Sequence, residues 1–268
     1  MQQSPHLASG AAQPPSPPGQ LSSDRGARWD GHASLQSTTR YRSPGARRTW
    51  SVAFLSAWIV SGLLLVLAEI NRLSLVNQVL AGQAISHADA INSDSLVAQL
   101  NGLHLLSYLG AGIAFLMWLH RVVSNNGALG ALGLRFTPGW AVGWWFIPFA
   151  NFVRPAQVVE EAWHAASTLP RSTPTPSPWL VRLWWGAWIL TNVIAGVAIT
   201  LGARTASALH DETVALIVGQ AVGMIAALLA IAVVVRLTSR QHEKRRGAAP
   251  VMSPVLQASP PSLAPSLD

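Results

Sequence analysis

Long apolar runs separated by short charged segments set the pattern of this chain. An α-helix rises about 1.5 Å per residue, so about 20 apolar residues cross a hydrocarbon core of about 30 Å. Four runs are long enough and carry no Asp, Glu, Lys or Arg in their interiors. They predict transmembrane spans at about residues 51–70, 96–120, 180–203 and 213–236.

The periodicity within these runs decides the fold class. None alternates apolar and polar residues with a period of two, which disfavours a membrane β-barrel. The first, third and fourth runs are apolar all round, whereas a helix of a soluble bundle shows a polar face. The sequence therefore predicts an all-α, polytopic integral membrane protein with four transmembrane helices.

A fifth apolar stretch between Arg135 and Arg154 has a different character. Pro138, Pro148 and Asn151 interrupt a helix there, and tryptophans crowd its first half. Tryptophan favours the membrane–water interface. Residues 138–153 are therefore expected to form an interfacial or re-entrant segment instead of a fifth span.

An amphipathic helix is predicted over residues 155–167. Pro155 suits the first turn of a helix, where its missing N–H costs nothing. Helical spacing puts four polar residues on one face and four mostly apolar residues on the other. The two sets are Gln157, Glu160, Glu161 and His164, and Val159, Ala162, Trp163 and Ala166. We expect this helix to lie along the membrane surface.

Composition agrees with lipid contact and separates the two ends from the middle. Charged residues make up only 11% of the chain, against about 25% in a typical soluble domain, and there are 12 tryptophans. Residues 1–46 and 243–268 are rich in Pro and Ser and poor in large apolar residues, so they are expected to be disordered tails. Residues 47–242 then form the transmembrane domain.

Basic residues indicate the orientation. With four spans, Arg72 and Arg204 fall on one side of the membrane and the other 16 of the 18 Lys and Arg residues fall on the opposite side. Loops rich in Lys and Arg stay in the cytoplasm. The sequence therefore predicts a protein of the plasma membrane with both termini in the cytoplasm. A fifth span would move Arg171, Arg182 and the five basic residues after the last span to the other side, so the bias argues against it.

The stretch PGWAVGWWFIPFANFVRP followed by QVVEEAW resembles the bacterial membrane proteins grouped as domain of unknown function 4328. FLMWLHRVVSNNGALG before it and LWWGAWIL after it are also similar to that family. The resemblance covers roughly residues 48–242. It implies a multi-pass membrane protein, mainly of actinobacteria, and supplies no known activity.

Candidate site residues gather in and after the proline-interrupted stretch. Asn151 and Arg154 stand where a helix start could bind an anionic head group, or they cap the helix and contact lipid phosphates without specificity. Glu161 and His164 have the Glu-x-x-His spacing of carboxylate-bridged metal sites, but a second set is missing and a solvated face is the simpler interpretation. The candidate lipid, ligand or structural motif comprises Trp144, Trp145, Pro148, Asn151, Arg154, Pro155, Glu160, Glu161 and Trp163.

Few polar residues interrupt the spans. His104 is expected to be a satisfied interfacial histidine. Asn192 and Gln220 are expected to form hydrogen bonds between helices, with a substrate site as the alternative. Gly219 and Gly223 form a GxxxG motif, which permits close helix packing either within the chain or between two copies.

No Cys, Walker loop, zinc-protease motif or nucleophile elbow is present in the sequence, and no catalytic residue, metal or cofactor is predicted. The first hypothesis is therefore a non-enzymatic scaffold or regulatory component of the cell envelope. The alternatives are a subunit of a solute or ion transporter or channel, and a lipid-modifying enzyme that uses Arg154, Glu160, Glu161 and His164. The expected partners are the lipid bilayer and either a second copy or another membrane protein, and not nucleic acid.

Overall fold

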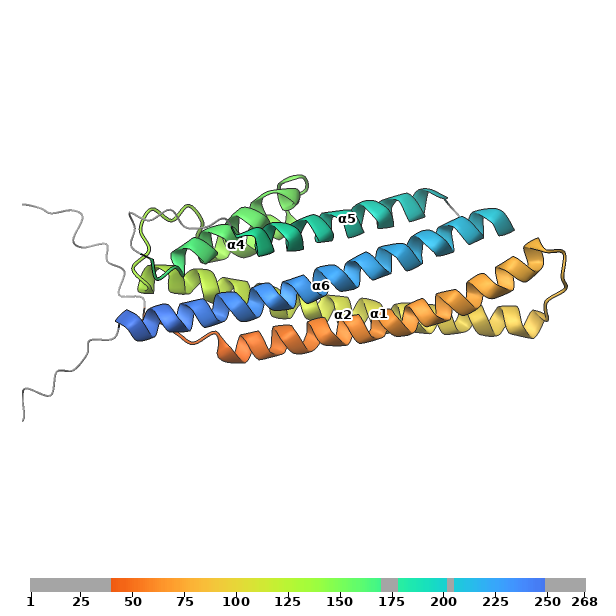
Figure 1. The fold of residues 1–268 in the computed structure, drawn as a ribbon, viewed down its shortest axis with the longest axis horizontal. Helices are drawn as coiled ribbons and strands as arrows, with labels where there is room; N and C mark the ends of the chain where they lie inside the picture. The colour runs from red at the N-terminus through yellow and green to blue at the C-terminus, as the bar shows by residue number, and fades with distance from the viewer. Residues whose placement is uncertain (1–39, 170–177, 202–204, 249–268) are drawn as a thin grey trace, which may run out of the picture. The chain divides into compact units, whose positions relative to one another are not determined.

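The computed structural model describes residues 40–169, 178–201 and 205–248, all within the unit Thr38–Asp268. Four long helices carry it: α1 (Gly45–Leu80), α2 (His87–Ala128), α5 (Trp179–Leu201) and α6 (Ala206–Ala248). They alternate in direction, with α1 and α5 running one way and α2 and α6 the other (Figure 1). Here "the base" is the end where α1 begins and α6 ends, and "the tip" is the opposite end.

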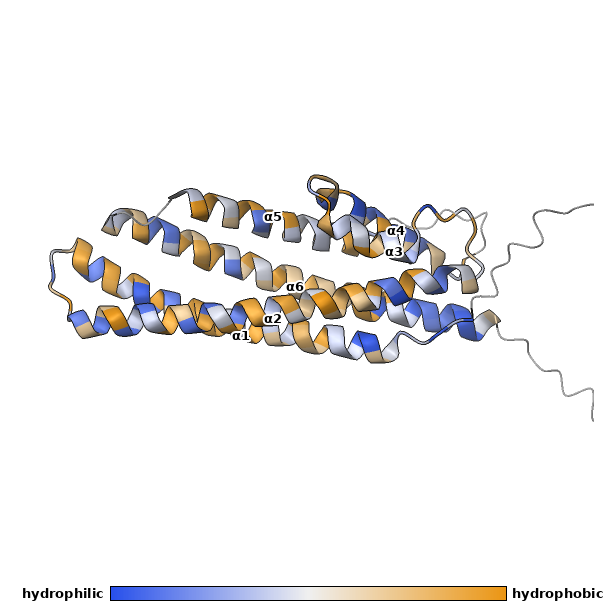
Figure 2. Cartoon of the chain, turned by 180° about the vertical axis from the view of Figure 1, so that it is seen from behind, coloured by the Kyte–Doolittle hydropathy of each residue, from blue (hydrophilic) through white to orange (hydrophobic). Residues whose placement is uncertain are grey.

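Each of the four long helices is long and apolar enough to cross a membrane. Hydrophobic residues fill their middle stretches, and hydrophilic residues gather toward the base (Figure 2). The described residues form helices and turns without a strand. The predicted all-α membrane fold with four spans is thus confirmed.

The contacts between the long helices determine their order in the bundle. The main interfaces are α1 with α2, α1 with α6, and α5 with α6. The four helices therefore follow the order α2, α1, α6, α5, and the two outer members of this row are α2 and α5. Between them, near the base, lie the short elements α3 (Pro138–Gly143), η1 (Trp144–Phe146), η2 (Ala150–Phe152) and α4 (Arg154–Ala165).

The main core lies in the base half, where α2, α4, α5 and α6 meet. Trp118, Leu119 and Val122 of α2 are fully buried there, as are Val233 and Leu237 of α6. Two hydrogen bonds connect α2 and α6 within this core. Trp118 Nε1 donates to Thr238 Oγ1 at 3.0 Å, and Gln241 Nε2 donates to the carbonyl oxygen of Val122 at 2.9 Å. A buried polar group costs free energy unless it is bonded, so these pairs fix α2 against α6.

The described part of the chain extends beyond the predicted transmembrane domain at both ends. α1 already begins at Gly45, and Asn125 bonds both the N–H and the carbonyl oxygen of Arg42. Residues 40–46 are therefore not part of a disordered tail. α6 continues to Ala248, because QHEKRR consists mostly of residues that tolerate a helix. The other residues of the predicted tails lie outside the described residues.

Candidate functional site

A cavity of about 490 Å³ lies between α2 and α5. Its remaining walls come from α1, α6 and the turns η1 and η2. Leu109 and Ile113 on α2 and Asn192 on α5 belong to the wall and are also exposed, so the cavity opens to the outside between these two helices. If α2 and α5 cross a bilayer, this opening faces lipid.

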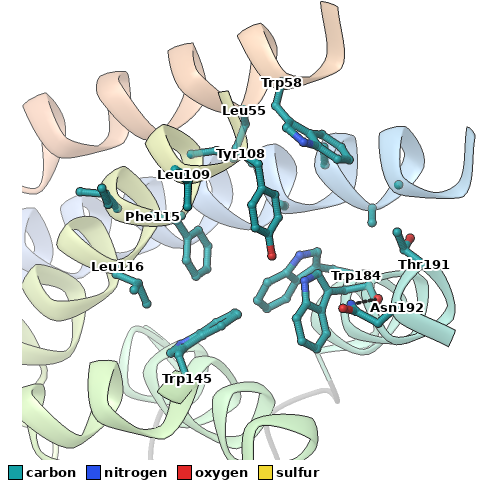
Figure 3. Close-up of a pocket in the computed structure, with 18 of the residues that line it drawn as sticks. Leu55, Trp58, Tyr108, Leu109, Phe115, Leu116, Trp145, Trp184, Thr191 and Asn192 are labelled. Carbon is teal, nitrogen blue, oxygen red and sulfur yellow. Dashed lines mark hydrogen bonds between the residues drawn. The ribbon is translucent and has the colours of Figure 1, made fainter. Parts of the chain in front are cut away.

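Aromatic rings form much of the wall. Tyr108 and Trp145 point into the space from opposite sides, and Trp58, Phe115 and Trp184 complete the surroundings (Figure 3). The ring of Trp145 meets Phe115 edge-on at 5.7 Å between centroids. Such edge-to-face pairs fix ring orientation, so this part of the wall is preformed.

Trp145 also reaches two indoles of α5. Its ring centroid lies 5.7 Å from that of Trp185 and 5.9 Å from that of Trp188. Trp185 and Trp188 are themselves stacked at 4.6 Å. The predicted site residue Trp145 thus connects α2 to α5 on this side of the cavity, beside the direct contact of Phe115 with Trp184 at 5.5 Å.

The proline-interrupted segment positions Trp145. Thr137 caps α3, with its Oγ1 accepting from the N–H of Trp140 at 3.4 Å, and Pro138 occupies the first turn. The chain leaves η1 in an extended conformation at Ile147, and Phe149 takes a φ of 62°, which is rare for a residue with a Cβ. This sharp turn about Pro148 prevents one continuous helix. No helix of this segment is among the helices that are long and apolar enough to cross a membrane in the described part of the chain, and its interfacial or re-entrant placement stays a prediction.

Asn151 contributes to the cavity wall, and Arg154 follows it by three residues without being part of the wall. The Oδ1 of Asn151 is buried without a hydrogen-bond partner in the described part of the chain. Arg154 is exposed, donates from Nη1 to Gln157 Oε1 at 3.1 Å, and lies over the Trp144 ring at 5.4 Å. Pro155, next in the chain, is buried in the first turn of α4. The arrangement leaves the Arg154 side chain exposed.

Glu160 and Glu161 of α4 accept hydrogen bonds from residues outside α4. Glu161 accepts from the backbone N–H groups of Arg135 and Phe136 at 2.8 and 3.2 Å. Glu160 Oε1 accepts from Arg182 Nε at 3.0 Å. Both carboxylates therefore connect α4 to neighbouring segments. No group of three or more potential metal ligands occurs among the described residues.

Trp163 faces away from the cavity and into the base of the bundle. It is buried in the main core, and the Arg240 guanidinium lies 4.7 Å from its ring. Burial lowers the pKa of Arg240, with the Glu243 charge acting in the opposite direction. Trp163 thus joins α4 to α6 as a packing residue.

The GxxxG pair is used inside the chain. A Cβ on Gly219 would lie 3.1 Å from the Ile194 side chain, and one on Gly223 would lie 2.8 Å from the Trp58 ring. Both glycines are buried. They allow α6 to approach α5 and α1 within one copy of the chain.

His104 has a hydrogen-bond partner on a neighbouring helix, as expected of a satisfied histidine. Its Nδ1 lies 3.0 Å from Ser61 Oγ, and its ring packs on Trp58 at 4.8 Å. Gln220 approaches the same place from α6, beside Gly62. Three helices thus bring polar side chains together just beyond Trp58. Asn192 instead bonds the carbonyl oxygen of Trp188 on its own helix.

Sequence reasoning found the turn that carries Trp145 but not most of the cavity wall. The wall residues it missed are mainly Leu55, Trp58, Tyr108, Phe115, Trp184 and Trp188. The one available signal was the spacing of Trp184 and Trp188, which puts them on the same face of α5. Nothing in the sequence pointed to Trp58 or Tyr108.

The fold and the cavity define a four-helix membrane protein with an aromatic-lined opening between two of its spans. The chain belongs to the family described as Domain of unknown function (DUF4328), whose model matches residues 81–239. This range includes α2, the turn segment, α4, α5 and most of α6. The family resemblance seen in the sequence is thereby confirmed. Comparisons with curated proteins and with solved structures give no match.

Proposed function

We propose that this protein is a non-enzymatic component of the bacterial plasma membrane that holds the apolar chain of a lipid between α2 and α5. The observation that carries the proposal is the cavity of about 490 Å³, which is walled by aromatic and aliphatic side chains and opens between two spans. Ligand sites in proteins occupy about 300–1,000 Å³ and are mostly apolar with a few polar groups. A side opening admits a ligand directly from the bilayer.

The position of the cavity along the helices favours a lipid of the base-side leaflet. The wall runs from Asn151 and Trp184 near the base to Gly223 and Ala195, which lie near the middle of their predicted spans. An acyl or isoprenoid chain entering from the base-side interface would follow this path. Arg154 is exposed three residues after the wall residue Asn151, and its charge would attract a phosphate or carboxylate head group.

The hydrogen bonds of the nearby carboxylates favour a holding role over catalysis. Glu160 bonds Arg182, and Glu161 bonds two backbone N–H groups, so neither is presented to the cavity as a general acid or base. The preformed ring contacts around Trp145 also favour a stable binding surface. A lipid held in this way would let the protein act as a scaffold or regulatory component of the envelope.

A second candidate function is a subunit of a transporter. It is favoured by the polar group Ser61, His104 and Gln220, because intramembrane polar residues often mark solute pathways. Flux of ions or small solutes in liposomes that hold the purified protein would support this alternative. Absence of flux, together with a tightly retained lipid, would favour the holding role.

The holding role is tested by filling the cavity. Gly112 belongs to the wall, and a Cβ there meets no atom within 4 Å, so Gly112→Phe places a ring in open space. Gly102→Phe on the same helix is the matched control, because Gly102 is also exposed and open but is not part of the wall. The probe is a phospholipid with a photoactivatable acyl chain, with cross-linked peptides mapped by mass spectrometry.

The expected result is cross-linking of the wild type at 108–116 and 184–192, loss of these cross-links in Gly112→Phe, and retention in Gly102→Phe. Even labelling along all lipid-facing helices, or equal effects of the two substitutions, would overturn the proposal.

A further inference from the structure

We infer that Arg42, Arg47 and Arg121 form a second, separate site, which binds the phosphate of an anionic phospholipid at the seam between α1 and α2. This site goes beyond the cavity and does not depend on it. The cavity faces α5, whereas this cluster lies on the side of α2 that packs against α1.

The backbone of α2 brings the three arginines together. Arg47 Nη1 donates to the carbonyl oxygen of Met117 at 2.9 Å. Two turns further along α2, Asn125 bonds the N–H and the carbonyl oxygen of Arg42 at 3.1 and 2.9 Å. Arg121 lies between these two positions, because residues 117, 121 and 125 fall on one helical face.

The cluster lacks a negative counterpart in the described part of the chain. No ion pair joins Arg42, Arg47 or Arg121 to a carboxylate there. Burial lowers the pKa of the Arg121 guanidinium, and the charges of Arg47 and Arg42 lower it further. The base-side carboxylates Glu160 and Glu161 are paired elsewhere, with Arg182 and Arg135. Like charges held together in this way favour an anion.

An apolar stripe below the cluster favours a lipid over a free phosphate ion. Trp50 and Phe54 lie one and two turns after Arg47 on α1 and are exposed, and Met117 is exposed one turn before Arg121 on α2. Arg47 precedes the predicted hydrocarbon span by four residues, about 6 Å along the helix. A phosphate at the cluster would therefore place its acyl chains over this stripe.

The test is a lipid titration of the full-length protein in detergent, read by native mass spectrometry, with phosphatidylglycerol and phosphatidylcholine of identical chains. Arg47→Gln combined with Arg121→Gln removes two charges from the cluster. Arg236→Gln combined with Arg246→Gln is the matched control, because it removes two exposed charges from α6 in the predicted base-side part of the chain. The cluster variant should bind phosphatidylglycerol about thirtyfold more weakly, and the control should bind like the wild type.

Two further experiments separate the effect of charge from that of structure, and the binding of a lipid from the binding of a phosphate ion. Arg47→Lys with Arg121→Lys should restore most of the phosphatidylglycerol binding, because it keeps both charges. Inorganic phosphate, compared with chloride at equal ionic strength, should not compete. Equal losses in the cluster and control variants, failure of the lysine pair to restore binding, or competition by inorganic phosphate would each overturn the proposal.

Discussion

Trp185 Nε1 donates a hydrogen bond to the carbonyl oxygen of Phe152 at 2.9 Å. This bond ties the proline-interrupted segment to α5, since Phe152 lies in η2 and Trp185 in the second turn of α5. Trp145, in the preceding turn η1, packs edge-on against the same indole. One side chain of α5 thus holds the segment at two points, and the base-side wall of the cavity depends on it.

Trp185→Phe should therefore loosen the segment without unfolding the bundle. The substitution keeps an apolar ring and removes one hydrogen bond, which contributes about 1 kcal/mol in a typical case. Faster hydrogen exchange is expected over 144–153, together with weaker lipid cross-linking in the cavity. Trp179→Phe is the control, because Trp179 is exposed at the start of the same helix. Unchanged exchange over 144–153 in Trp185→Phe would contradict this role.

The spans were predictable, whereas the cavity was not, and the reason is physical. Hydropathy depends on the lipid that surrounds each helix, so the apolar runs indicate α1, α2, α5 and α6 directly. The cavity depends on which helices pair and on where Trp145 lies between Phe115 and Trp188. Such contacts join residues far apart in sequence. The same applies to Asn125, which holds Arg42 across 83 residues, so composition alone gave the tail too many residues.

Glu161→Gln is expected to destabilise the base more than Glu160→Gln. Glu161 is mostly buried and accepts two backbone hydrogen bonds, and bonds to a charged group contribute about 1.5–3 kcal/mol. Glu160 bonds Arg182, whose side chain is 66% exposed, so solvent screens the pair and the cost is about 0–1 kcal/mol. The free energy of unfolding in mixed detergent micelles measures both. Equal losses would show that Glu161 does not anchor residues 135 and 136.

Gly223→Ala should lower stability although alanine favours helices. The new Cβ would lie 2.8 Å from the Trp58 ring, which forces a shift at the contact of α6 with α1 and costs about 1–3 kcal/mol. Gly196→Ala on α5 is the matched control, since a Cβ there meets no atom within 4 Å and should be neutral or stabilise by up to about 1 kcal/mol. Unfolding in mixed micelles would detect the difference. A Gly223→Ala variant as stable as Gly196→Ala would refute this packing role.

Acid should loosen the attachment of residues 40–44 to α6. His242 Nε2 lies 3.3 Å from Ser43 Oγ, and Tyr41 packs edge-on against the same imidazole. Burial, and then the charges of Arg246, Arg48 and Arg245, lower the pKa of His242 below its ordinary 6.5. Between the lowered pKa of the folded state and pH 6.5, the unfolded state therefore binds more protons than the folded state. The stabilising contribution is complete above about pH 6.5 and is lost as the pH falls through the lowered folded-state pKa.

Hydrogen exchange of the Arg42 amide, which donates to Asn125 Oδ1, reports this attachment. After correction for the intrinsic rate, its protection should fall between pH 7.5 and pH 5 in the wild type and stay level in His242→Gln. Equal pH dependence in the two proteins would exclude His242 as the titrating group.

The start of α1 and the end of α6 should lie on the same side of the membrane, and that side should be the cytoplasm. The chain contains no Cys, so single substitutions report the side directly. Gln83 and Ser207 are exposed at the tip, and Thr168 and Gly247 are exposed in segments predicted to lie at the base. With an impermeant maleimide, intact cells should label Cys only at 83 and 207, and permeabilised cells should label all four. Labelling of 168 and 247 from outside, with 83 and 207 both protected, would show the reverse orientation and contradict the 16-to-2 distribution of basic residues. Labelling at 83, 168 and 247 from outside, with 207 protected, would instead require one further crossing between α2 and residue 168. The turn at Pro148 and Phe149 would then cross the bilayer, and the cavity beside it would lie on a solute path instead of holding a lipid chain.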